Sequence, residues 1–117
     1  MADDVTAPER ELAPKDIAEL AGAELIDVRR DYEFEEGHLA GARRIEMNEL
    51  TAQADSIPRD RPVVFYCRTG NRSGMAADAF REAGYDAHNM AGGITAWAEE
   101  GLPLEPESGG VAQPRPI

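Results

Sequence analysis

Residues 63–73 read Val63-Val64-Phe65-Tyr66-Cys67-Arg68-Thr69-Gly70-Asn71-Arg72-Ser73, and this stretch decides the fold. Its apolar, β-branched and aromatic start predicts a short buried strand. Beyond Ser73, apolar residues recur at the spacing of an amphipathic helix, at Ala76, Ala79, Phe80 and Ala83. A tight loop between a strand and a helix directs its backbone N–H groups toward one point, where they favour a bound anion. We therefore predict that this loop is the functional site.

The loop contains Cys67, the only cysteine of the chain, with Arg68 beside it and Arg72 five positions later. A single cysteine is often no more than a small buried hydrophobic residue. Here, however, the helix dipole, the converging amides and the two guanidinium groups all favour thiolate over thiol. We predict that the pKa of Cys67 is lowered and that its sulfur is a nucleophile.

The remaining polar residues of the loop suit the same arrangement. Gly70 and Asn71 are residue types that tolerate a positive φ, which a loop that curls its amides inward requires. Two roles stay open for Ser73: it caps the following helix, or its hydroxyl donates a hydrogen bond to the sulfur.

Length and charge limit the class of protein. A chain of 117 residues with 42% hydrophobic residues predicts one soluble globular domain. The formal charge of −11 argues against nucleic acid and anionic membrane surfaces as partners. No apolar run approaches the roughly 20 residues of a membrane helix, and residues 1–4 are acidic, unlike a signal peptide. Since one cysteine allows no internal disulfide, we expect a cytoplasmic protein. A monomer is the default expectation.

Short strands alternate with short helices along the rest of the chain. Besides the central strand, strands are expected at 9–12, 24–28, 44–45 and 85–89. Helices are expected from Pro14, over 47–54, after Ser73 and after Gly93, with a turn or short helix at 31–36. This alternation predicts an α/β sandwich on a mostly parallel sheet, with the ligand beyond the carboxyl ends of the strands. Polar residues 1–8 and the proline- and glycine-rich residues 105–117 are expected to be flexible tails of a domain spanning 9–104.

Three segments of the chain resemble the rhodanese family of sulfurtransferases. Residues 67–73 resemble its active-site loop. Its amino-terminal signature resembles Asp27-Val28-Arg29 followed by Glu33-Phe34, Gly37-His38 and Gly41-Ala42. Its carboxyl-terminal signature resembles Gly92-Gly93, Trp97 and Gly101-Leu102-Pro103. The resemblance implies a rhodanese-like three-layer sandwich with a small, mostly parallel central sheet flanked by helices.

The resemblance also implies a reaction. The Cys67 thiolate attacks the outer sulfur of a donor such as thiosulfate, and a thiophilic acceptor, cyanide or a thiol, then removes that sulfur from the cysteine persulfide. The substrate-binding residues implied are Arg68, Thr69, Gly70, Asn71, Arg72 and Ser73. The loop amides would bind the persulfide, and the two arginines would bind the sulfonate of an anionic donor. No cofactor is implied, and the spacing of the two histidines and one cysteine predicts no metal site.

Other functions remain as alternatives. Some phosphatases and arsenate reductases share this fold, but their signature is C-x5-R, whereas Cys67 and Arg72 form C-x4-R. A persulfide carrier that receives sulfur from a partner protein would use the same residues. A non-catalytic binding module has no need of the cysteine and both arginines. Outside the loop, we interpret Asp27, Arg29, His38 and Trp97 as structural residues.

Overall fold

The computed structural model describes residues 10–112. Within that part of the chain, a sheet of five parallel strands has the order β1-β5-β4-β2-β3. The strand bounds are Glu11–Leu12 (β1), Glu24–Asp27 (β2), Arg43–Arg44 (β3), Val63–Tyr66 (β4) and Ala87–Met90 (β5). The predicted central strand is therefore β4, which pairs with β2 on one side and β5 on the other. The predicted edge strand is β1, which pairs with β5 alone.

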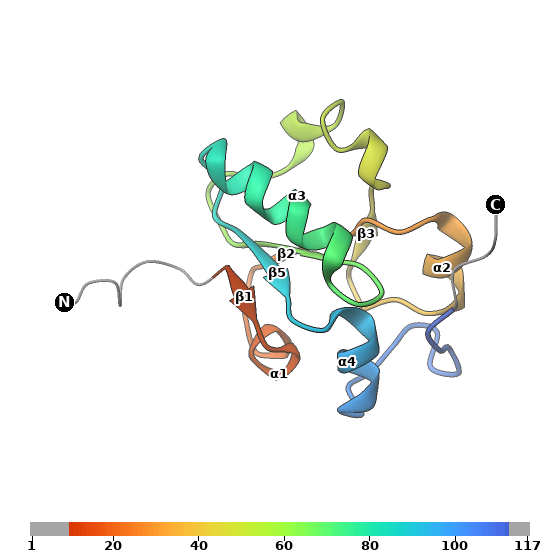
Figure 1. The fold of residues 1–117 in the computed structure, drawn as a ribbon. Helices are drawn as coiled ribbons and strands as arrows, with labels where there is room; N and C mark the ends of the chain where they lie inside the picture. Colours follow the sequence, from red (N-terminus) through yellow and green to blue (C-terminus); the bar gives the residue numbers. More distant parts are fainter. Residues whose placement is uncertain (1–9, 113–117) are drawn as a thin grey trace.

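Helices cover both faces of the sheet. Figure 1 shows α3 on one face and α1 and α4 on the other. The helix bounds are Pro14–Ala18 (α1), Asp31–Glu36 (α2), Met47–Glu49 (η2), Ala54–Ser56 (η3), Asn71–Glu82 (α3) and Gly93–Glu99 (α4). Of these, η2 and η3 are single turns of 3-10 helix.

Two hydrophobic clusters, one on each face, follow from the alternation of side chains along β4. Val63 and Phe65 pack in the cluster that contains the buried face of α3. Val64 and Tyr66 pack in the other cluster, with Ile17 of α1 and the α4 residues Ile94 and Trp97. Because β4 is buried on both faces, its sequence is a continuous apolar run.

The buried face of α3 differs from the predicted one. Its buried residues include Ser73, Ala76, Ala77 and Phe80, whereas Ala79 and Ala83 are exposed. The helix also begins at Asn71, two residues before Ser73. Alanine fits a buried or an exposed position, so the alanines do not determine the rotation of the helix about its axis. Phe80 determines this rotation, because it packs on Phe65 and Tyr85.

The helix predicted over residues 47–54 is wrong. The structure has the two separate 3-10 turns η2 and η3 there, joined by hydrogen-bonded turns. The segment is nevertheless anchored in the core, since Leu50 is buried and Met47 and Ala54 pack on the same cluster. A helix of eight residues is not stable by itself, so packing decides the shape of such a segment.

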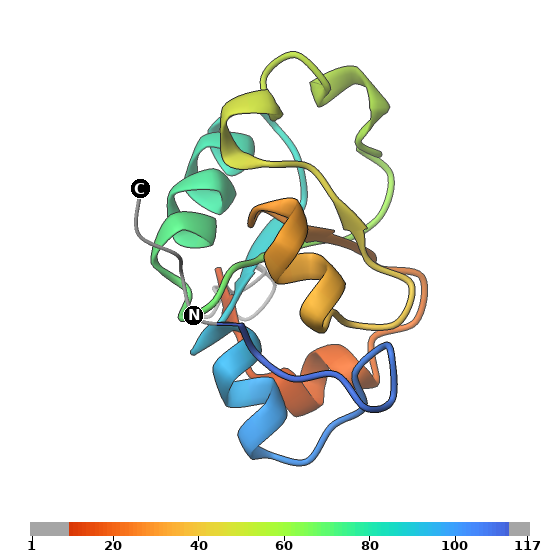
Figure 2. The same ribbon diagram turned by 90° about the vertical axis from the view of Figure 1, so that its right-hand side faces the viewer.

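Residues 105–112 differ from the flexible tail that the sequence predicts. Glu105 and His38 form an antiparallel bridge, with backbone hydrogen bonds of 2.7 and 2.9 Å. Gly110 N–H donates to the carbonyl of Glu36 at 3.0 Å, so the segment runs beside α2 (Figure 2). These bonds involve backbone groups, which composition does not reveal. Residues 113–117 and the predicted tail at 1–8 lie outside the described residues, and the domain limits at 9 and 104 stay predictions.

Within residues 10–112, no helix has both the length and the apolar character needed to cross a membrane.

Candidate functional site

The predicted loop joins the carboxyl end of β4 to α3. Cys67 directly follows the last residue of β4 and is only 2% exposed. Gly70 is the N-cap of α3 and has a φ of 104°, which favours glycine strongly. Its backbone N–H donates a hydrogen bond to Cys67 Sγ at 3.1 Å. Asn71 does not have the positive φ that the sequence suggested, because every described residue with a positive φ is a glycine.

Hydrogen bonds control the charge of the sulfur. Burial alone would raise the pKa of the Cys67 thiol. Hydrogen bonds from the Ser73 hydroxyl and from the amides of Ser73, Gly70 and Thr69 outweigh burial, so the pKa lies below its ordinary value. The predicted direction of the pKa shift is thus found, but its leading favourable causes are these hydrogen bonds rather than the arginine charges.

The structure decides between the two roles left open for Ser73. The residue lies inside the first turn of α3, and no side chain caps this helix. The Ser73 hydroxyl oxygen is 3.3 Å from Cys67 Sγ and 2.6 Å from Asn89 Oδ1, and Ser73 is fully buried. The capping role is wrong, and the hydroxyl lies beside the sulfur.

The two arginines of the loop have different surroundings. Arg72 Nη2 lies 3.9 Å from Glu33 Oε2, and the Arg72 side chain is 40% exposed while Glu33 is buried. Among residues 10–112, this Glu33 oxygen has no hydrogen-bond partner, and Arg72 is the cation that forms an ion pair with it. For the Arg68 guanidinium, the described residues provide no hydrogen bond or ion pair, which leaves it available to an anionic ligand.

Helix α4 supports the loop from the other side. The N–H groups of Ile94 and Thr95 donate to the carbonyls of Cys67 and Arg68 at 2.9 and 3.1 Å. Gly93 permits this approach, since a Cβ there would lie 2.4 Å from the Arg68 carbonyl oxygen. The start of α4 at Gly93 therefore holds the backbone of the loop in place.

A polar cavity of about 260 Å³ borders the loop on the side of β1 and β5. Its lining includes Thr69, Gly70 and Asn71 from the loop region, together with Glu11 and Asn89 from the two strands. Sequence reasoning missed Glu11 and Asn89, and it also missed Glu33 as the partner of Arg72. No local motif marks the first two, because they come together only when β1 pairs with β5.

The residues interpreted as structural are found in structural positions. Arg29 and Asp27 form a fully buried ion pair with an N–O distance of 2.6 Å. The His38 ring stacks on Phe34 with centroids 3.7 Å apart, and its Nδ1 is 2.8 Å from the Phe34 carbonyl oxygen. Trp97 is 5% exposed.

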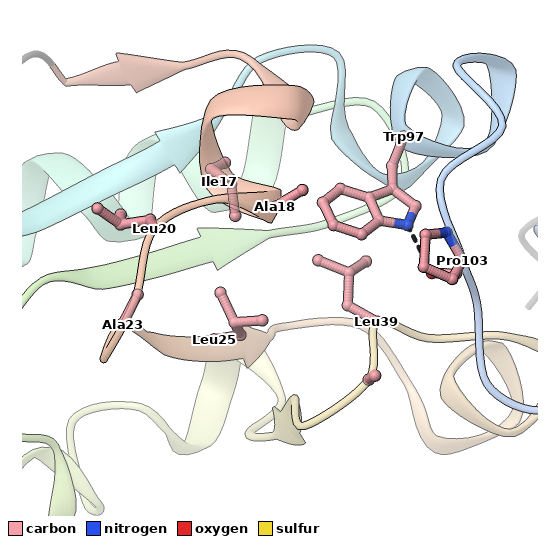
Figure 3. Close-up of a pocket in the computed structure, with 9 residues that line it drawn as sticks. Ile17, Ala18, Leu20, Ala23, Leu25, Leu39, Trp97 and Pro103 are labelled. Atoms are coloured by element: carbon pink, nitrogen blue, oxygen red, sulfur yellow. Dashed lines mark hydrogen bonds between the residues drawn. The ribbon is translucent and has the colours of Figure 1, made fainter.

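An apolar cavity of about 250 Å³ lies between α1, β2 and α4, away from the loop. Figure 3 shows Leu25, Leu39 and Trp97 around it, with Trp97 Nε1 donating to the Pro103 carbonyl at 2.8 Å. Its lining has no ionisable side chain and so offers no group for acid–base or nucleophilic chemistry. Among residues 10–112, no three His, Cys, Asp or Glu side chains are grouped so as to hold a metal ion.

The lowered pKa of Cys67 predicts how its reactivity depends on pH. Because the folded-state pKa is lowered, the thiolate is present above that pKa and is lost as the pH falls through it. We expect the rate of alkylation by iodoacetamide to reach half its maximum below the ordinary cysteine value of about 8.5. The same chain in urea should have its midpoint near that value. Equal midpoints for folded and unfolded protein would contradict the lowered pKa.

Comparison with known protein sequences gives several matches. Residues 12–100 match the family model of the rhodanese-like domain. A sulfurtransferase of Allochromatium vinosum is 40% identical over 81 residues, which cover 68% of this chain and 76% of that protein. The thiosulfate sulfurtransferase GlpE of Pseudomonas aeruginosa is 32% identical over 89 residues, 74% of this chain and 81% of that protein. The uncharacterized protein YqhL of Bacillus subtilis is 43% identical over 76 residues, 64% of this chain but only 60% of YqhL.

A solved structure is also similar to this chain. The crystal structure of a rhodanese-related protein from Thermoplasma volcanium has a TM-score of 0.78 and 30% identity to this chain. The match covers 82% of this chain and 97% of that one.

Proposed function

Since the chain belongs to the rhodanese-like domain family, we propose that it is a sulfurtransferase that uses Cys67 as its nucleophile. In this proposal, sulfane sulfur moves from a donor such as thiosulfate to cyanide or a thiol through a persulfide on Cys67. The observation that carries the proposal is the buried Sγ, which accepts hydrogen bonds from Gly70 N–H and the Ser73 hydroxyl at 3.1 and 3.3 Å. The names of two relatives, a sulfurtransferase and a thiosulfate sulfurtransferase, support it.

The first step loads sulfur onto the cysteine. The Cys67 thiolate attacks the outer sulfur of thiosulfate, a new S–S bond forms, and sulfite leaves with the electron pair of the bond that breaks. The lowered pKa of Cys67 increases the fraction of the sulfur that is thiolate at a given pH. Arg68, which has no partner among the described residues, binds the sulfonate together with Arg72.

The second step regenerates the thiolate. A thiophilic acceptor attacks the outer sulfur of the persulfide, and the electron pair of the Cys67 S–S bond returns to Sγ. The amides of Thr69 and Gly70 and the first turn of α3, from Asn71 to Ser73, bind the persulfide and stabilise the charge that returns. No step requires a cofactor or a metal ion.

The length of the loop argues against phosphate chemistry. Four residues separate Cys67 from Arg72, one fewer than in the C-x5-R signature of phosphatases with this fold. A shorter loop encloses a smaller space, and here Gly70 N and the Ser73 hydroxyl oxygen both lie within hydrogen-bond distance of the single sulfur atom. We therefore propose sulfur, rather than a tetrahedral oxyanion, as the transferred group.

A loading experiment with competing donors tests the proposal. The protein is treated with thiosulfate, 3-mercaptopyruvate or a protein persulfide, and its intact mass is followed. We expect thiosulfate to add one sulfur atom, which cyanide then removes. Arg68→Ala should slow loading from thiosulfate by about tenfold or more, since it removes a charge-assisted hydrogen bond.

The controls separate donor choice from function. Arg61→Ala, which removes the same charge from an exposed pair with Glu24, should leave the loading rate unchanged. Loading by the protein persulfide alone would indicate a sulfur carrier rather than a thiosulfate enzyme. A chain whose mass no donor increases is not a sulfurtransferase.

A further inference from the structure

The Ser73 hydroxyl lies between two acceptors. One is Cys67 Sγ at 3.3 Å, and the other is Asn89 Oδ1 at 2.6 Å. Ser73 is fully buried and Asn89 is 3% exposed, so water does not readily replace either partner. A hydroxyl has one proton to donate. It therefore cannot donate to the sulfur and to Asn89 at the same time.

The hydrogen-bond partners of Asn89 fix the direction of its amide. Its Nδ2 group donates to Glu11 Oε1 and Oε2 at 3.1 and 3.0 Å and to the Gly70 carbonyl at 3.1 Å. All three are acceptors only, so the NH2 group must face them. Asn89 Oδ1 consequently faces Ser73 as an acceptor, and Glu11 holds it there from the neighbouring strand β1.

We propose that Asn89, oriented by Glu11, is a positioning residue that competes with Cys67 for the single hydroxyl proton of Ser73. When Sγ is uncharged, the hydroxyl donates to Asn89 Oδ1 and no buried donor is left without an acceptor. When Sγ is a thiolate, the hydroxyl turns to the sulfur. Asn89 acts on the sulfur only through Ser73.

The competition matches the charge changes of sulfur transfer, and to this extent the inference rests on the proposed function. In the persulfide the negative charge is on the outer sulfur, while Sγ is bonded to two atoms and carries no full charge. When the acceptor removes the outer sulfur, the electron pair returns to Sγ, which then needs the proton of Ser73. Asn89 thus provides an alternative acceptor during the half of the cycle in which the sulfur needs no donor.

Other charged groups surround the loop and are unchanged in the Ser73→Ala and Asn89→Leu variants that test the competition at Asn89. They are Arg10 and Glu11 beside β5, Glu33 on α2, Arg68 in the loop and Arg72 on α3. None of them donates a hydrogen bond to Cys67 Sγ, whose donors are backbone amides of the loop and the Ser73 hydroxyl. Their contribution to the charge of the sulfur is therefore a constant background in those variants.

The test is a double-mutant cycle on the pKa of Cys67, measured as the pH dependence of alkylation by iodoacetamide. Ser73→Ala should raise the pKa by about one unit, because the thiolate loses a donor. Asn89→Leu, which has a similar shape but no acceptor, should lower it by about as much. The double variant Ser73→Ala/Asn89→Leu should have the pKa of Ser73→Ala alone.

Two outcomes would overturn the proposal. One is a pKa that rises or stays constant in Asn89→Leu; the other is an Asn89→Leu effect that persists in the Ser73→Ala background. A residue that only packs against the loop would give the second result. Alkylation needs no sulfur donor, so the double-mutant cycle can be interpreted even if the chain transfers no sulfur.

A second variant covers the case in which Asn89→Leu does not fold. Glu11→Ala changes an exposed side chain and removes two of the three acceptors that orient the Asn89 amide. It should lower the pKa of Cys67 more in the native chain than in Ser73→Ala. The change in Ser73→Ala measures the loss of the Glu11 charge alone. Equal changes in both backgrounds would contradict the competition.

Discussion

Cys67→Ser is expected to abolish the formation of thiocyanate from thiosulfate and cyanide while the protein stays folded. The chain has no other thiol, so no second residue can form the persulfide. A serine hydroxyl is far less acidic than a thiol and does not accept sulfane sulfur from the donor. Losing the nucleophile of a covalent mechanism typically costs a factor of about 10³ or more. The rate of thiocyanate formation measures this loss directly.

Two further observations secure the interpretation of this variant. Its thermal unfolding midpoint should be close to that of the native chain, since Gly70 N–H can donate to the new hydroxyl as it does to Sγ. Its intact mass should not increase on treatment with thiosulfate. Thiocyanate formation at more than a small fraction of the native rate would exclude a persulfide on Cys67 as the intermediate.

The sequence predicted the centre of the fold well because the signals there are local. A continuous apolar run predicted β4, and the change to helical spacing placed α3 next to it. The loop between them, with Cys67 and both arginines, needed no knowledge of distant residues. The predicted rhodanese-like sandwich is confirmed by the family match over residues 12–100 and by the likeness to a solved rhodanese-related structure.

The sequence could not predict the contacts that depend on which strands are neighbours. Asn89 and Glu11 are 78 positions apart and meet because β1 pairs in parallel with β5. Nothing local to either residue indicates a link to the sulfur. The pair of Arg72 and Glu33 could not be predicted for a similar reason, since α2 and α3 meet only in the folded chain.

The sequence did indicate that the pKa of Cys67 is lowered but not the main reason. Arginines and a helix N-terminus can be recognised from the order of residues, so the sequence alone attributes the lowered pKa to them. The geometry instead assigns the lowering to the Ser73 hydroxyl and to the amides of Thr69, Gly70 and Ser73. The direction of an N–H group follows from the backbone dihedral angles, and that of a hydroxyl from its side-chain torsions and neighbouring acceptors. The order of residues specifies neither.

The largest effect on stability is expected from breaking the ion pair between Asp27 and Arg29. Both side chains are 0% exposed, and the guanidinium donates to both carboxylate oxygens, at 2.8 and 2.6 Å. Burial tends to lower the pKa of Arg29, but its hydrogen bond and charge interaction with Asp27 raise it, so the guanidinium stays charged. Arg29→Met leaves the Asp27 carboxylate buried without its countercharge. We expect the free energy of unfolding in urea to fall by about 3–5 kcal/mol.

Two controls show whether this loss comes from an unpaired buried charge. Arg61→Met, at the exposed pair with Glu24, should cost less than about 1 kcal/mol. Asp27→Asn/Arg29→Met, which removes both charges, should recover part of the stability lost in Arg29→Met. The pair of Asp27 and Arg29 is also linked to the site. Arg29 donates a hydrogen bond to the Gly37 carbonyl at the end of α2, and α2 carries Glu33, which lies opposite Arg72. If Arg29→Met lowers the free energy of unfolding no more than Arg61→Met does, the buried pair does not hold α2 in place, and Arg72 must be positioned by α3 alone.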